Sequence, residues 1–221
     1  MKNYKRILDF YKSLDSDWDL PSGVELIFPF KQRMVIKYMN TFYRKFYNDS
    51  AKRYLLFGIN PGRLGAGMTG IPFTDPIHLN DHCGISNVLD LKHELSSKFI
   101  YEIIEAYGGT EQFYKKYYIT SLCPLGFLKD SKNFNYYDSP ELFNAVKKHI
   151  VNSVEQQLEI PCFRDKAYSI GQGKNFEYFK KLNDKHNWFD EIIPLPHPRW
   201  VLQYKRKTKE KYIAEYLEKL S

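Results

Sequence analysis

The sequence predicts an α/β fold of three layers, with a central four-stranded parallel sheet between two layers of helices. Short apolar segments alternate with longer amphipathic ones along the chain, and each apolar segment ends at a turn containing Pro or Gly. This alternation favours parallel strands, because a helical crossover joins each strand to the next. A chain of 221 residues is sufficient for one such core. We therefore expect a single domain over residues 1–221.

Two helices are expected before the first strand. Apolar residues recur at helical spacing over 3–14, and a second apolar stripe runs over 30–47. The turn Pro21-Ser22-Gly23 separates the two segments. We expect these N-terminal helices, within residues 1–50, to pack on the sheet.

Four segments have the length and apolar content of buried strands. They are 53–59, 117–122, 166–170 and 191–195. The carboxyl ends of parallel strands meet at one edge of a sheet, and ligands bind there. The loops that follow the first, second and fourth strands are therefore expected to build the site.

Four later segments have helical periodicity: 98–107, 140–158, 175–182 and about 205–220. Ser139 and Pro140 have the residue types favoured at the N-cap and first position of a helix. Gly108-Gly109 has the residue type favoured at the C-terminal end of a helix and is expected to end the helix over 98–107. The last segment carries six Lys and Arg residues, and Lys205, Arg206, Lys207, Lys209 and Lys211 lie close together at its start.

The charge of the chain favours a polyanionic partner. The net charge is +7 and the isoelectric point is about 9.1, which favours nucleic acid through counterion release. No apolar run approaches the roughly 18 residues of a membrane span, and the charged start does not resemble a secretory signal. We expect a cytoplasmic protein that does not bind membranes.

The cysteines and histidines do not predict a metal site. Cys83, Cys123 and Cys162 are far apart in sequence, which indicates free thiols in a reducing compartment rather than a zinc ribbon or iron–sulfur cluster. His78 and His82 have the i, i+4 spacing of metal ligands, but no further ligand is apparent. We expect neither a metal nor an organic cofactor.

The loop after the first strand is rich in glycine. The segment 65–70 formally satisfies G-x-G-x-x-G, but Pro72 and Pro76 follow where the dinucleotide fingerprint requires a helix. The segment 171–174 suggests a phosphate loop but lacks the complete Walker pattern. A strand-to-helix turn is the simpler interpretation of that second segment.

Three motifs in this order resemble the uracil-DNA glycosylase superfamily, and above all its single-strand-selective monofunctional branch. The first is Asn60-Pro61-Gly62 followed by Thr69-Gly70-Ile71-Pro72-Phe73. Ser121-Leu122-Cys123-Pro124-Leu125 is similar to the second motif, and Pro196-His197-Pro198-Arg199 to the third. The resemblance covers about 54–206 and implies a uracil-DNA glycosylase-like fold.

The resemblance implies a DNA glycosylase of base excision repair that hydrolyses the N-glycosidic bond of a flipped-out uracil. Asn60 would orient the attacking water, and His197 would donate a hydrogen bond to the base oxygen as negative charge develops there. An amide is not a general base, so the water is positioned rather than deprotonated. No lysine replaces Asn60, so no Schiff-base step or strand nicking is expected.

The resemblance also assigns the base-binding residues. Phe73 would stack on the base, and Met68 would lie in the same pocket. Gly62 stands where the strictest uracil enzymes have a tyrosine that blocks a 5-methyl group, so 5-substituted uracils such as 5-hydroxymethyluracil are expected substrates. Ser121 replaces the asparagine that reads the base edge. This replacement relaxes selectivity and extends it to hypoxanthine or xanthine.

The DNA-binding residues follow from the same motifs. The candidates are Pro61, Arg63, Arg199, Trp200, Lys205 and Arg206. The segment after His197 is two residues shorter than in the family, so Trp200, Tyr204 or Arg199 is the candidate wedge that enters the duplex gap. Single- or double-stranded DNA with a damaged base is the expected partner, and we expect a monomer.

Two other functions remain open at this level. One is a catalytically weak or inactive nucleic-acid-binding module on the same fold. The other is a protein that binds or cleaves small nucleotides or nucleosides. The glycosylase and the inactive module should both bind DNA with an affinity that falls steeply with salt, whereas a nucleotide-binding protein should bind free nucleotides independently of salt.

Overall fold

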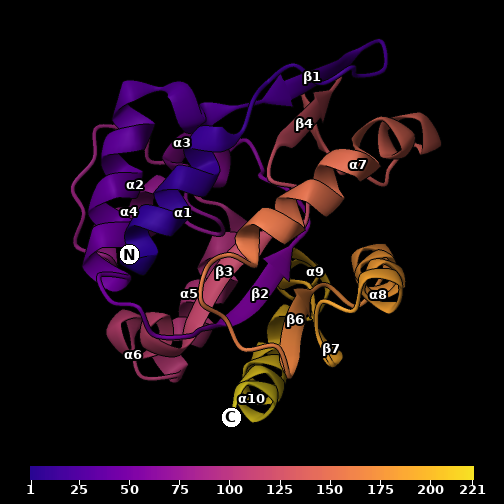
Figure 1. Cartoon of the computed structure of the whole chain (residues 1–221). Coiled ribbons are helices and arrows are strands. Elements are labelled where there is room, and N and C mark those ends of the chain that lie inside the picture. The colour runs from indigo at the N-terminus through magenta and orange to yellow at the C-terminus, as the bar shows by residue number, and fades with distance from the viewer.

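The parallel sheet expected from the sequence is present. The computed structural model describes all residues 1–221 and contains a four-stranded parallel sheet in the order β3-β2-β6-β7, with helices on both faces (Figure 1). The strands are β2 (Tyr54–Gly58), β3 (Tyr117–Ser121), β6 (Lys166–Ile170) and β7 (Glu191–Leu195). Each lies within its predicted segment, so the predicted fold class is confirmed.

The helices also agree with the sequence periodicity, with additions. The long helices are α1 (Asn3–Ser13), α2 (Arg33–Phe46), α5 (Leu95–Ala106), α7 (Pro140–Gln157), α8 (Lys174–His186) and α10 (Lys209–Leu220). The shorter ones are η1 (Pro29–Lys31), α3 (Ala66–Thr69), α4 (Pro76–Asp81), α6 (Thr110–Lys116), α9 (Pro198–Tyr204) and η2 (Arg206–Thr208). The last predicted helix, about 205–220, corresponds to η2 and α10. The helix α9, which precedes it and ends before Lys205, was not predicted. None of the helices is both long and apolar enough to cross a membrane.

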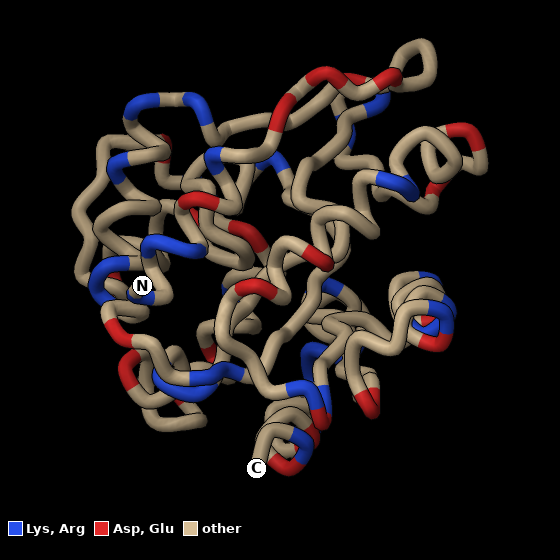
Figure 2. Tube along the Cα trace, in the orientation of Figure 1, with Lys and Arg blue, Asp and Glu red and all other residues tan.

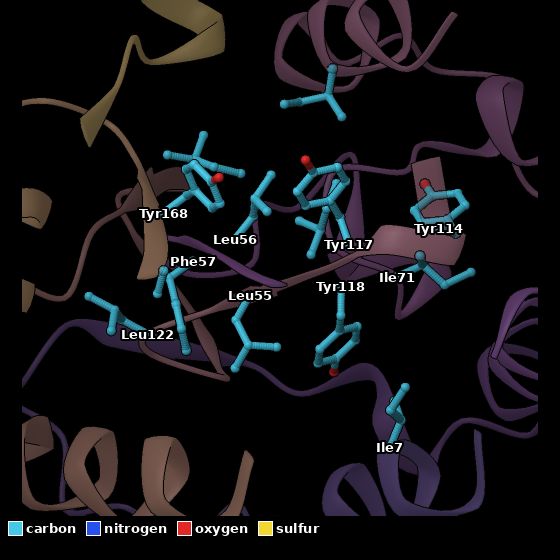
Figure 3. Close-up of a cluster of buried hydrophobic side chains, with 14 of the residues drawn as sticks. Ile7, Leu55, Leu56, Phe57, Ile71, Tyr114, Tyr117, Tyr118, Leu122 and Tyr168 are labelled. Carbon is cyan, nitrogen blue, oxygen red and sulfur yellow. The ribbon is translucent and has the colours of Figure 1, made fainter. Parts of the chain in front are cut away.

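The two faces of the sheet pack against different helices. Leu55 and Tyr118 point to one face and Leu56 and Tyr117 to the other, as alternation along a strand requires (Figure 3). Tyr118 contacts α2 through Tyr43, and the Tyr117 hydroxyl reaches the carbonyl of Leu220 at the end of α10. A single cluster of 53 buried hydrophobic residues joins both layers.

The start of α7 is set by its sequence. The Ser139 side chain accepts a hydrogen bond from the Leu142 amide at 3.1 Å, and Pro140 occupies the first turn. The predicted N-cap is therefore confirmed.

A second sheet was not predicted. It is antiparallel, in the order β1-β4-β5, and consists of β1 (Val24–Ile27), β4 (Gly126–Lys129) and β5 (Lys132–Phe134). The hairpin turn between β4 and β5 places Asp130 and Ser131 at positive φ, +50° and +58°. Two-residue hairpins of this geometry favour Asn-Gly, so Asp-Ser gave only a weak turn signal.

Candidate active site

Two adjoining cavities open at the carboxyl edge of the parallel sheet. The first, here called the Asn60 cavity, has a volume of about 290 Å³ and is lined by Ile59, Asn60, Pro61, Gly62, Phe73, Glu94, Ser96, Asn133, Asn135, Tyr137, His197 and Arg199. The second, here called the Gly171 cavity, measures about 410 Å³ and is lined by Ile59, Tyr137, Gly171, Gln172, Gly173, Lys174, Asn175, His197 and Trp200. His197 lines both. The cavities lie beside β2 and β6, where the strand order reverses.

The side chain of Asn60 is held in place by the unpredicted hairpin. Its Oδ1 accepts a hydrogen bond from the Tyr136 amide at 3.1 Å, and its Nδ2 donates to the Phe134 carbonyl at 3.3 Å. The Tyr136 hydroxyl in turn donates to Asn175 Oδ1 at 2.9 Å. The orientation of the Asn60 amide is therefore fixed by the backbone after β5, which is anchored at the start of α8.

His197 lies between β7 and α9 as the N-cap residue of that helix. Burial, together with the Arg199 guanidinium nearby, lowers the pKa of His197 to about 4. The imidazole is therefore neutral at pH 7, and its N–H is a hydrogen-bond donor without a positive charge. The ring is packed against Gly171, where an added Cβ would lie 3.6 Å from His197 Cδ2.

The loop after β2 places the ring of Phe73 in the Asn60 cavity. Thr69 organises this loop, because its hydroxyl bonds to the Thr74 carbonyl at 2.6 Å and accepts from the Ile71 amide at 3.1 Å. Phe73 has a φ of +53°, a conformation that is strained for a non-glycine residue. Its ring lies so close to Gly58 that an added Cβ there would be 2.6 Å from Phe73 Cε2.

Asp75 has a structural position behind the cavity. It is fully buried, caps α4 by accepting from the His78 amide at 2.9 Å, and accepts from the Glu94 amide at 2.9 Å. Burial alone would raise the pKa of Asp75, but the hydrogen bonds from His78 and Glu94 together hold it below its ordinary value. Capping of α4 and the hydrogen bond from Glu94 therefore account for the contacts of Asp75.

Comparison with known proteins supplies the family. The model of the Uracil DNA glycosylase superfamily matches residues 44–221. This chain belongs to the uracil-DNA glycosylase superfamily. The crystal structure of wild-type SMUG2 from Pedobacter heparinus is similar to it with a TM-score of 0.96 and 42% sequence identity, over 99% of this chain and 96% of that one. The predicted resemblance to the single-strand-selective monofunctional branch is confirmed.

Membership of the uracil-DNA glycosylase superfamily establishes the class of reaction. The chain is a DNA glycosylase, a hydrolase of N-glycosyl bonds that acts on DNA. The predicted site residues differ in whether they line the two cavities.

The Asn60 cavity brings together six of the residues predicted from the sequence. Asn60, Pro61, Gly62, Phe73, His197 and Arg199 all line it. Trp200 lines the adjoining Gly171 cavity and is 40% exposed. Arg63, Lys205 and Arg206 are exposed and line neither cavity.

Two predicted base-binding residues lie outside both cavities. Met68 is half-buried in α3, and Ser121 is 7% exposed at the end of β3. The Ser121 carbonyl accepts a hydrogen bond from Gln157 Nε2 at 3.3 Å. Any contact of Ser121 with a base in the Asn60 cavity would therefore need a bridging water, because its short side chain does not reach that cavity.

Sequence reasoning missed five polar residues of the Asn60 cavity. It is lined by Glu94, Ser96, Asn133, Asn135 and Tyr137, and none belongs to a motif used above. Asn133 lies in β5, which was not predicted, and Asn135 and Tyr137 follow that strand. Polar residues next to an expected helix start, as at Glu94 and Ser96, were the one available signal.

Proposed function

We propose that this glycosylase extrudes uracil from DNA into the Asn60 cavity and hydrolyses its N-glycosidic bond without a covalent intermediate. The observation that carries the proposal is that Asn60 and His197, predicted as a pair, line one cavity together with Phe73. In this reaction the bond between C1′ and the base nitrogen breaks, its electron pair leaves with the base, and the oxygen of water bonds to C1′. The proton that this water loses passes to the solvent, and the base anion takes up one proton from the solvent. We further propose that the chain works as one domain and as a monomer.

Each residue has a defined task in the proposed reaction. Asn60 positions the water, since its amide is fixed by Tyr136 and Phe134. His197 donates a hydrogen bond to the base oxygen that gains negative charge, and its neutral ring suits a donor that need not lose a proton. Phe73 stacks on the base with a contribution of about 1–3 kcal/mol.

The substrate range follows from the cavity wall at Gly62. Without a side chain there, the wall leaves room for a 5-substituent, so we propose that 5-hydroxymethyluracil is released as well as uracil. Hypoxanthine and xanthine are further proposed substrates, because Ser121 stands where an asparagine would read the pairing edge of uracil. Met68 and Ser121 line neither cavity, and we propose that they act on the base indirectly, Ser121 through a bridging water. The three buried, free cysteines support a cytoplasmic location.

The deciding experiment is formation of abasic sites in oligonucleotides that contain one uracil, 5-hydroxymethyluracil or hypoxanthine. We expect release of uracil and 5-hydroxymethyluracil, and no strand nick before alkali treatment. A chain that binds these oligonucleotides but releases no base would be the inactive binding module instead.

Charged residues near the cavity are expected to bind the DNA backbone. Figure 2 shows Lys and Arg distributed over all parts of the chain rather than on one element. We assign phosphate contacts to Arg63, Lys205 and Arg206, because they are exposed and flank the motif loops. We expect binding that weakens steeply between 50 and 200 mM salt, roughly ten-fold for every two phosphates contacted. Titration of a labelled oligonucleotide over that salt range measures the slope.

Trp200 is the proposed wedge that fills the gap left by the extruded base. Its ring is exposed at the Gly171 cavity, packs edge-on against Tyr212, and lies 5.6 Å from Lys205 Nζ. Trp200→Ala is expected to slow uracil release from duplex DNA about ten-fold more than from single strands, since only a duplex has a gap to fill. Tyr204→Ala is the comparison. A larger duplex effect at Tyr204 would transfer the wedge role to that residue.

The low pKa of His197 predicts the pH dependence of the reaction. Because its pKa is lowered to about 4, the imidazole stays neutral as pH falls from 8 to 5, and the single-turnover rate should not change through ionisation of this residue. A rate that titrates with a pKa near 6.5 would contradict this. The stability of the fold, in contrast, should depend on pH through this residue. Unfolded histidine takes up a proton near pH 6.5, so this residue favours unfolding progressively as pH falls from about 6.5 towards 4.

A further inference from the structure

One charged group of the Asn60 cavity has no task in the proposed reaction. Glu94 immediately precedes α5, is only 9% exposed, and lines the cavity. The Ser97 hydroxyl donates to its Oε2 at 2.9 Å, while its Oε1 accepts no hydrogen bond from the protein. The nearest cation, Arg199 Nη2, is 4.0 Å from Oε1. This oxygen faces the cavity without a protein donor, so it is free to accept a hydrogen bond from a ligand there.

The carboxyl group of Glu94 lies against the wall made by two glycines. A Cβ at Gly62 would be 3.3 Å from both Glu94 Oε1 and Asn133 Nδ2, and a Cβ at Gly65 would overlap Glu94 Oε2. A side chain at either position would displace the carboxyl group. The glycines therefore make room for Glu94 as well as for a base, and the open wall at Gly62 is bounded by a polar oxygen.

We propose that Glu94 determines which 5-substituents of uracil this enzyme accepts. The inference rests on the proposed function and deepens it. A base stacked on Phe73 with its C5 edge towards Gly62 brings a 5-substituent within reach of Oε1. A hydroxymethyl group donates a hydrogen bond to that oxygen. The methyl group of thymine would displace water from the oxygen without replacing the lost hydrogen bond.

The proposal predicts that the enzyme leaves thymine in place although the wall at Gly62 is open. Size does not exclude thymine there, because 5-hydroxymethyluracil is larger. The polarity of Oε1 provides the discrimination instead. Burial raises the pKa of Glu94, and Ser97 and Arg199 oppose that effect. The recognition holds in either protonation state, because a neutral carboxyl group also accepts from a hydroxyl.

The test compares single-turnover release of 5-hydroxymethyluracil, uracil and thymine from single-stranded oligonucleotides. We expect Glu94→Ala to lower the ratio of 5-hydroxymethyluracil to uracil rates at least about ten-fold, the effect of losing one hydrogen bond to a charged group. The same variant should acquire measurable release of thymine. Glu94→Asp, which withdraws the oxygen but keeps the charge, should lower the ratio in the same direction. Glu94→Gln retains an acceptor and should stay within about three-fold of the wild-type ratio.

Glu105→Ala is the matched control. Glu105 lies in the last turn of α5, the helix that Glu94 precedes. It is exposed and pairs with His82 away from the cavity, so all rates should be unchanged. If Glu94→Ala and Glu94→Asp lower the release rates of all substrates equally, the proposal is overturned, and Glu94 serves only to support Arg199. Wild-type enzyme that releases uracil but not 5-hydroxymethyluracil would also overturn it. Wild-type enzyme that releases no base would instead refute the proposed function.

Discussion

Replacing His197 with alanine is expected to lower the single-turnover rate of uracil release about a hundred-fold or more. The imidazole lies at the junction of both cavities, and burial keeps it neutral by lowering its pKa to about 4. A hydrogen-bond donor aimed at an oxygen that becomes charged in the transition state is worth roughly 3–4 kcal/mol. Because that charge is absent in the ground state, the dissociation constant for uracil-containing DNA should change little. Rapid-quench measurement of abasic sites at saturating enzyme gives the rate.

His186→Ala is the matched control for this prediction. His186 lies on α8, stacks on Trp188 and is 3.7 Å from Glu155, in neither cavity. Its loss should leave the rate within about two-fold of wild type. If His197→Ala lowers the rate of uracil release by less than ten-fold, another group stabilises the leaving base.

Replacing Asn60 with alanine is the second large effect, again about a hundred-fold in the rate of release. The amide cannot accept a proton from the water, so its contribution is to hold one water in line with the sugar carbon. A misplacement of that water by about 1 Å lowers the rate by about a hundred-fold. Two backbone groups, the Tyr136 amide and the Phe134 carbonyl, hold the Asn60 side chain. The same single-turnover assay measures the loss.

Asn60→Asp distinguishes positioning by the hairpin from acid–base chemistry. The substitution replaces the donor that faces the Phe134 carbonyl with an oxygen, so the two oxygens would repel each other and the side chain would turn away. We expect a rate well below that of the wild type and no recovery at high pH. Asn80→Ala, an exposed asparagine on α4, is the control and should be neutral. A fully active Asn60→Asp would indicate that the fixed amide is dispensable.

The strands and long helices were predictable because each depends on local properties of the chain. Buried parallel strands such as β2 and β6 are short apolar runs bounded by Gly or Pro, and they need no partner to be recognised. The N-cap at Ser139 is likewise a local signal. The antiparallel sheet was missed because its strands have three or four residues and an Asp-Ser turn.

The candidate site was only partly predictable, for a physical reason. Asn60, Phe73 and His197 belong to motifs and follow strands, so their proximity follows from parallel strands ending at one edge. Glu94 comes from a segment before α5, and Asn133 from β5. Their place in the cavity depends on how these segments pack over the sheet edge, and no periodicity in the sequence encodes that packing.

The sequence by itself determined the parallel sheet, the class of enzyme and the pair Asn60 and His197, because motif residues and apolar periodicity are local along the chain. The tertiary structure alone decided how the Asn60 amide is held, that the His197 ring is neutral, and that a carboxylate borders the open wall at Gly62. Each of these depends on groups more than 30 residues apart in sequence, or on exclusion of water from the cavity. Hydrogen-bond geometry and burial exist only once the chain has folded.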